Sequence, residues 1–149
     1  MADRINRLAR IIYRFYSKWN STQYNACMAA STDLWGEIEA TQIRTPLVIL
    51  REQAALLGAK TKNLVEASVK THASGDTFIH KLNLVVPALD NYTYNLFTIT
   101  HGPSIYPVSV VYKTIRFETE QEFIEWLATT LSSPETKRIV SNLLSQVAA

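Results

Sequence analysis

Three histidines are the residues of this chain best suited to acid–base or metal chemistry, because imidazole titrates near neutral pH and readily ligates metals. His72 and His80 lie on either side of a tight-turn signal, Gly75-Asp76, and His101 begins a second turn signal, His101-Gly102-Pro103-Ser104. A metal site at the first pair requires both imidazoles on one face of the hairpin that this turn would form.

The hydrophobic pattern of the hairpin places His72 and His80 on opposite faces. Apolar residues are odd-numbered before the turn and even-numbered after it. The two apolar sets meet only if paired residues have numbers that add to an odd value. A two-residue turn at Gly75-Asp76 meets this condition and pairs Thr71, not His72, with His80. We therefore expect no metal at this pair.

His80 falls on the apolar face, where the sequence predicts other polar side chains nearby. If the strand ending at His101 presents its odd-numbered side inward, His101 lies on the same face, close to Tyr106. Two imidazoles and a phenol could line a pocket or transfer a proton. The alternative is a buried histidine that is hydrogen-bonded to a backbone or hydroxyl group. No acidic residue is obviously placed beside the three, which weakens a hydrolase interpretation.

Other catalytic and cofactor motifs are absent from the sequence. Glycine occurs only at positions 36, 58, 75 and 102, so there is no phosphate-binding loop, and neither His-Glu-x-x-His nor Gly-x-Ser-x-Gly is present. The single cysteine, Cys27, excludes an internal disulfide framework and suits a reducing cytoplasm. The sequence favours a protein without catalytic residues, metal or cofactor.

The elements that must position these residues have an α+β order. Four strand-like runs within about residues 62–117 predict an antiparallel meander, and helical patterns flank it. The predicted helices span about residues 3–19, 22–41, 46–57, 120–131 and 134–147. With 149 residues and 47% hydrophobic residues, the chain suits one globular domain over 1–149.

The third and fourth strands predict a sheet that is apolar on both sides. A four-residue loop at 101–104 pairs Phe97 with Val108 and Ile99 with Tyr106. The opposite face is also apolar, and its candidate partner-binding residues are Tyr92, Tyr94, Leu96 and Val111. Such a sheet is covered on both faces, either by its own helices or by a second molecule.

The first predicted helix carries a basic face. Its apolar residues recur at three- and four-residue steps, and Arg7, Arg10, Arg14 and Lys18 fall on the other side. Arginine suits contacts with phosphates, but the same pattern suits an acidic protein surface, an anionic membrane surface or plain solvation.

The sequence favours a small cytoplasmic interaction module that binds a protein partner or a second copy through the basic helix and the tyrosine-rich sheet face. One alternative is a small-ligand-binding or enzymatic domain with a pocket around His80, His101 and Tyr106. Another is nucleic-acid binding through the first helix, since the basic residues outnumber the acidic ones strongly there while the whole chain has a net charge of only +2.

Overall fold

The computed structural model describes residues 32–148, and the predicted helix 3–19 with its basic face lies outside this range. Residues 42–149 form a compact unit distinct from the preceding residues. In the preceding unit, described residues 32–41 contain neither helix nor strand, so the helix predicted over 22–41 does not extend through them. Gly36 adopts φ +68° there, and the Asp33 carboxylate accepts a hydrogen bond from the N–H of Trp35 at 2.9 Å. Both features are typical of a turn.

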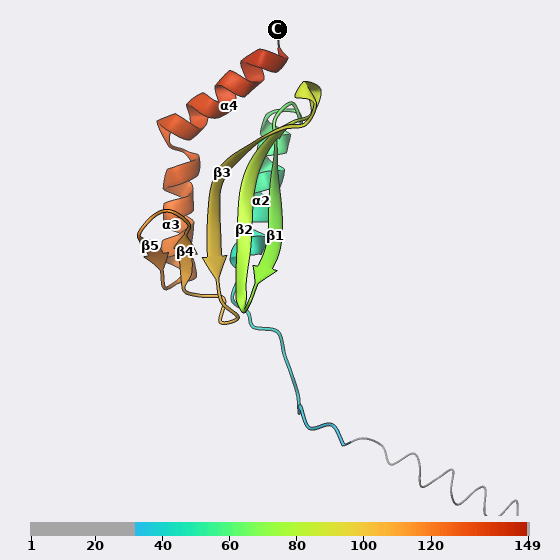
Figure 1. Cartoon of the computed structure of the whole chain (residues 1–149), viewed down its shortest axis with the longest axis vertical. Helices are drawn as coiled ribbons and strands as arrows, with labels where there is room; N and C mark the ends of the chain where they lie inside the picture. The colour runs from blue at the N-terminus through green and yellow to red at the C-terminus, as the bar shows by residue number, and fades with distance from the viewer. Residues whose placement is uncertain (1–31, 149) are drawn as a thin grey trace, which may run out of the picture. The chain divides into compact units, whose positions relative to one another are not determined.

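The compact unit is an α+β fold, as predicted. Five strands form one antiparallel sheet in the order β1-β2-β3-β4-β5, with one helix before the sheet and two after it (Figure 1). In chain order, the elements are α2 (Pro46–Lys60), β1 (Glu66–Ser74), β2 (Thr77–Val86), a 3-10 turn (Pro87–Leu89), β3 (Tyr92–His101), β4 (Val108–Val110), β5 (Ile115–Phe117), α3 (Glu120–Leu131) and α4 (Pro134–Val147). The predicted fourth strand is two short strands, because a turn at 111–114 interrupts it, with Tyr112 at φ +65°.

The β1–β2 hairpin has the predicted register. Ser74 pairs with Thr77 around the two-residue turn, Val69 pairs with Leu82, and Thr71 pairs with His80. The parity argument therefore identified which side chains share a face.

A β-bulge in β3 changes which side chains of that strand point toward the helices. Leu82 pairs with Phe97 but Asn83 pairs with Asn95, so Leu96 is an extra residue on β3. One inserted residue reverses the alternation of side chains. The tyrosines before the bulge therefore lie on the same face as Phe97, which corrects the expectation of a sheet that is apolar on both sides.

The β3–β4 pairing differs from the predicted one by four residues. Ile99 pairs with Val110 and His101 with Val108, so Val108 does not pair with Phe97. Between the strands, Ile105 donates its N–H to Gly102 O at 3.2 Å, and Tyr106 donates to Ser104 O at 2.9 Å. These local bonds use N–H groups that the predicted pairing would have placed in the ladder, so the loop is longer than four residues.

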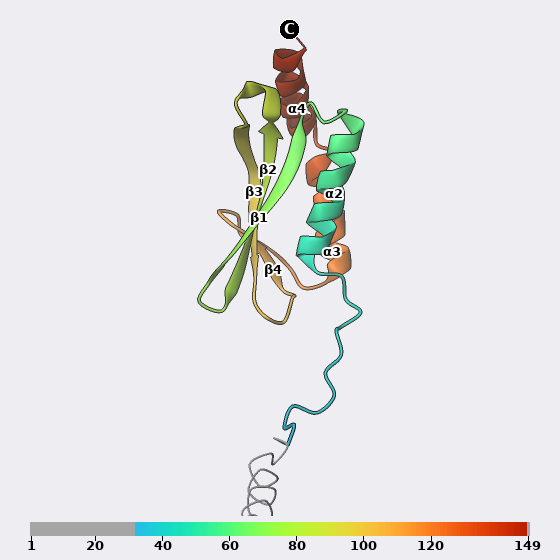
Figure 2. The ribbon, with the colours of Figure 1, turned by 90° about the vertical axis from the view of Figure 1, so that its right-hand side faces the viewer.

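All three helices cover one face of the sheet, and Figure 2 shows α2 and α3 on the same side of it. The side chains of Thr45, Thr119 and Ser133 accept hydrogen bonds from the first turns of α2, α3 and α4, as N-caps do. The core between the layers has two clusters of buried residues, one of which contains Leu50, Leu82, Phe97, Ile99 and Phe123. The second cluster contains Val65, Leu84, Val86 and Leu143. Within residues 32–148, none of the helices has the length and hydrophobicity needed to cross a membrane.

Candidate functional site

His80 and His101 meet on the helix-covered face of the sheet, as their spacing predicted. Their Nε2 atoms are 2.9 Å apart and their ring centroids 5.0 Å apart. His80 comes from the middle of β2 and is only 2% exposed, whereas His101 is the last residue of β3. His72 pairs with Ile79 on the opposite face, so it takes no part in this site.

The hydrogen-bond partners of the pair determine where the protons lie. His101 Nδ1 lies 2.8 Å from the carbonyl oxygen of Gly102, which can only accept, so Nδ1 carries a proton. In neutral His101, Nε2 is then the acceptor, and His80 donates to it through Nε2–H. His80 Nδ1 is left to accept the hydroxyl proton of Thr71, which is 2.8 Å away. Every polar atom of both rings is satisfied when both are neutral.

Burial, with smaller electrostatic contributions from His101 and Arg51, lowers the pKa of His80 from 6.5 to about 4. The neutral form is therefore strongly favoured at neutral pH. This arrangement suits a structural hydrogen-bond chain that orders the end of the sheet.

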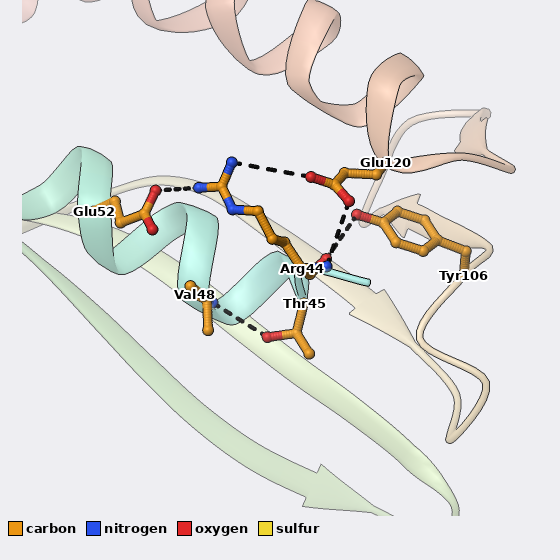
Figure 3. A network of polar contacts seen from close by, with 6 residues as sticks. All are labelled: Arg44, Thr45, Val48, Glu52, Tyr106 and Glu120. Atoms are coloured by element: carbon orange, nitrogen blue, oxygen red, sulfur yellow. Dashed lines mark hydrogen bonds and ion pairs between the residues drawn. The ribbon is translucent and has the colours of Figure 1, made fainter. Parts of the chain in front are cut away.

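Tyr106 takes part in a separate polar network (Figure 3). Its hydroxyl donates to the backbone oxygen of Arg44 at 3.4 Å, and the Arg44 side chain forms ion pairs with Glu52 and Glu120. Burial and the nearby carboxylate of Glu120 raise the pKa of Tyr106 to about 12. The network ties the β3–β4 loop to the start of α2 and to the first turn of α3.

An apolar cavity of about 720 Å³ lies between the sheet and the helices. The side chains of Ala67, Leu82, Leu84 and Leu96 line it from the sheet. Its helical lining is Ile49, Gln53, Ala54, Leu56, Leu57 and Lys60 from α2, Ile124, Leu127, Ala128 and Leu131 from α3, and Thr136, Lys137, Val140 and Ser141 from α4, with Ser132 between them. His80, His101 and Tyr106 are not among the lining residues.

This cavity was not predicted from the sequence, because no local pattern indicates it. Its lining comes from α2, α3, α4 and three strands, and its apolar residues have the pattern of an ordinary hydrophobic core. The one unusual signal is a pair of lysines, Lys60 and Lys137, within an otherwise mainly apolar set that contains no Asp or Glu. Within residues 32–148, neither lysine forms an ion pair with a carboxylate.

The predicted partner-binding residues of the sheet do not form one continuous exposed surface. Tyr92 and Tyr94 remain 48% and 38% exposed, at the end of β3 far from β4. Leu96 instead lines the cavity. Val111 lies in the turn after β4 and donates its N–H to Thr98 O at 2.9 Å. The predicted basic surface of Arg7, Arg10, Arg14 and Lys18 lies outside the described residues.

Residues 32–148 contain no group of three or more His, Cys, Asp or Glu side chains placed to hold a metal ion. Comparison of the chain with protein-family models, with curated proteins and with solved structures gave no match.

Proposed function

We propose that this domain binds an amphipathic small molecule, a long-chain carboxylate, in the apolar cavity between the sheet and the helices. The observation that carries this proposal is the cavity itself, which is larger than a packing defect in a core of this size. Small-molecule sites have volumes of about 300–1,000 Å³ and a mainly apolar lining with a few polar groups. The cavity of about 720 Å³ fits this description.

The charges of the lining favour an anionic ligand. Lys60 lies in the last turn of α2 and Lys137 in the first turns of α4, so both amines flank an apolar space without a neutralising carboxylate among the lining residues. A hydrocarbon chain would bury against the leucines, and a carboxylate would pair with one or both amines. Each buried methylene group contributes about 0.8 kcal/mol, so chain length should govern the affinity.

The direct test is a fluorescence titration with 11-(dansylamino)undecanoate, followed by displacement with unlabelled hexadecanoate. Ala128 lines the cavity from an exposed position on α3, so Ala128→Trp should fill the space without disturbing the core. We expect this variant to bind at least about tenfold more weakly. Ala55→Trp is the matched control, since Ala55 is also exposed and helical but does not line the cavity. Equal binding by both variants would contradict the proposal.

The role of the lysines can be tested separately. The double variant Lys60→Met/Lys137→Met should lose affinity for hexadecanoate by about tenfold while retaining affinity for hexadecanol, which has no charge. The matched control Lys62→Met changes an exposed lysine outside the cavity and should bind both compounds normally. Equal losses for acid and alcohol would mean that the lysines do not recognise the carboxylate.

Binding of a protein partner is a second candidate function, and the exposure of Tyr92 and Tyr94 favours it because tyrosine is enriched in interfaces. The basic residues of the first predicted helix would contribute to the same contact, or would bind nucleic acid with a strong dependence on salt. Light scattering of the wild type and of Tyr94→Glu tests self-association through this surface. A wild-type dimer that becomes a folded monomer in the variant would support it, and an unchanged mass would contradict it.

A further inference from the structure

Strand β1 leaves one long edge of the sheet open. Among residues 32–148, it pairs with β2 on one side only, and Figure 1 shows it at the border of the sheet. The strand has nine residues, Glu66–Ser74, and contains neither proline nor a bulge in its pairing with β2. Natural proteins usually protect such an edge with short strands, proline or bulges, because unpaired backbone groups can bind another strand.

The backbone groups on this edge can be identified from the hairpin. Ser74 and Thr77 close a two-residue turn, so they form a hydrogen-bonded pair, and such pairs alternate along an antiparallel ladder. The even-numbered residues of β1 therefore exchange hydrogen bonds with β2. The N–H and C=O groups of Ala67 and Val69 point away from β2, toward the open edge.

The open face of the sheet carries a charge imbalance beside this edge. Lys70 lies directly opposite Lys81 of β2, and like charges in this position are unfavourable. Glu66 lies four residues before Lys70 on the same face, which is about 13 Å along a strand and too far for an ion pair within one strand. Both side chains are exposed, and within residues 32–148 neither forms an ion pair. The edge therefore offers a positive and a negative position with this spacing.

We propose that β1 pairs antiparallel with β1 of a second copy of this chain, about a twofold axis at Ser68. In this register, Glu66 of each copy faces Lys70 of the other, and the added carboxylate lies beside the Lys70–Lys81 pair. Ala67 faces Val69 and exchanges hydrogen bonds with it through the free backbone groups. Two sheets join into one, with the helices of both copies on the same side. This interface is independent of the cavity and of the proposed ligand.

The charges select this register among its neighbours. An axis at Lys70 would place two lysines face to face, and an axis at Glu66 would do the same with two glutamates. An axis placed between two residues would pair even-numbered residues with odd-numbered ones. The apolar face of one copy would then lie beside the open face of the other. An axis at Val69 or at Ala67 keeps like faces together but does not place Glu66 opposite Lys70.

The central position, Ser68, also suits the axis. Its Oγ is buried and has no hydrogen-bond partner within the described residues. On the axis, the two Ser68 residues would form a non-hydrogen-bonded backbone pair, in which side chains approach most closely. A rotation about χ1 would let each hydroxyl reach the other.

Sedimentation equilibrium of the full chain tests the proposal by measuring its dimer dissociation constant. Glu66→Lys and Lys70→Glu each replace two attractive cross-strand pairs with two repulsive ones, so each should weaken dimerisation by about tenfold or more. The double variant Glu66→Lys/Lys70→Glu exchanges the charges and should restore the dimer. A monomeric wild type, or a double variant as weak as the single ones, would overturn the proposal.

Disulfide trapping tests the register itself. In a Cys27→Ser background, Glu66→Cys/Lys70→Cys should form a covalent dimer on mild oxidation, whereas either single cysteine should not. A covalent dimer from Lys70→Cys alone would place the axis at residue 70 and overturn the assignment. Tyr94→Glu should leave dimerisation unchanged, and a monomeric Tyr94→Glu variant would show that the copies meet elsewhere.

Discussion

His80 links the stability of the fold to pH. Its pKa is about 4 in the folded protein and near 6.5 in an unfolded chain, so the unfolded state binds a proton first as the pH falls. Stability from this residue is fully present above pH 6.5 and decreases as the pH falls toward 4. Between pH 7 and pH 5 we expect His80 to lower the free energy of unfolding by about 2 kcal/mol.

Urea unfolding at pH 7 and pH 5 measures this effect. The variant His80→Gln should be less stable at pH 7, because the hydrogen bonds to Thr71 and His101 are lost, but its stability should vary less with pH. The control His72→Gln changes an exposed histidine on the other face and should retain the wild-type difference. If the His80→Gln variant kept the full pH dependence, another group would be responsible.

At the level of residues, the sequence was informative where strand pairing is local. The two-residue turn and the alternation of apolar residues placed His80 opposite Thr71, and the hydrogen bond between their side chains follows from that register. The same reasoning grouped Tyr106 with the histidines, but its hydroxyl binds the backbone of Arg44. The contact joins residues that are 62 positions apart in the chain, and no local pattern encodes it.

Among the elements, β3 has a bulge whose two sides are joined by hydrogen bonds of the Asn95 side chain. The side-chain amide of Asn95 donates to Asn83 Oδ1 of β2 at 3.0 Å. It also donates to the backbone oxygen of Phe97, the residue after the bulged Leu96, at 3.3 Å. These bonds lie on the face of the sheet opposite α2, α3 and α4. Asn83 is itself buried, so it depends on this partner.

We expect Asn95→Ala to lower the free energy of unfolding by about 1–3 kcal/mol, because the buried Asn83 side chain loses its partner. Thr93→Ala is the control, since Thr93 lies on the same face of β3 and its hydroxyl bonds only to Asn91 O nearby. Chemical denaturation of both variants provides the comparison. A loss no larger than that of the control would mean that the backbone alone maintains the bulge.

Helices α2, α3 and α4 and the first hairpin were predictable because their signals are local. Thr45, Thr119 and Ser133 cap these three helices, which lie where the ranges 46–57, 120–131 and 134–147 were predicted. The bulge was not predictable, since the run from Tyr92 to Phe97 contains apolar residues at both parities. Its hydrogen bonds involve Asn83 of another strand, so only the assembled sheet reveals them.

For the whole molecule, the proposed ligand binding in the cavity would be coupled to folding. The walls of the cavity come from α2, α3, α4 and the sheet, so an unfolded chain has no such site. A ligand present at a hundred times its dissociation constant should therefore raise the free energy of unfolding by about 2.7 kcal/mol.

Thermal unfolding with and without hexadecanoate, below its micellar concentration, would measure this coupling. The melting temperature of the wild type should rise with ligand concentration, and that of Ala128→Trp should change little. An increase of the same size in both proteins would indicate a nonspecific effect of the fatty acid. The cavity itself could not be predicted from sequence, because its existence depends on how six elements pack together.

The single extra residue in β3 determines what a one-residue deletion in this strand would change. Loss of the one codon for Leu96 would preserve the reading frame and nearly all of the composition, yet it would remove the bulge. Tyr92 and Tyr94 would keep Val86 and Leu84 as partners and stay on the helix-covered face, because Tyr94 and Phe97 would then be two residues apart in a regular strand. The deletion would instead remove one apolar side chain, that of Leu96, from the wall of the cavity. If the cavity binds the proposed ligand, a one-residue gap at this position should therefore alter the contacts of the ligand without changing the face on which the tyrosines lie.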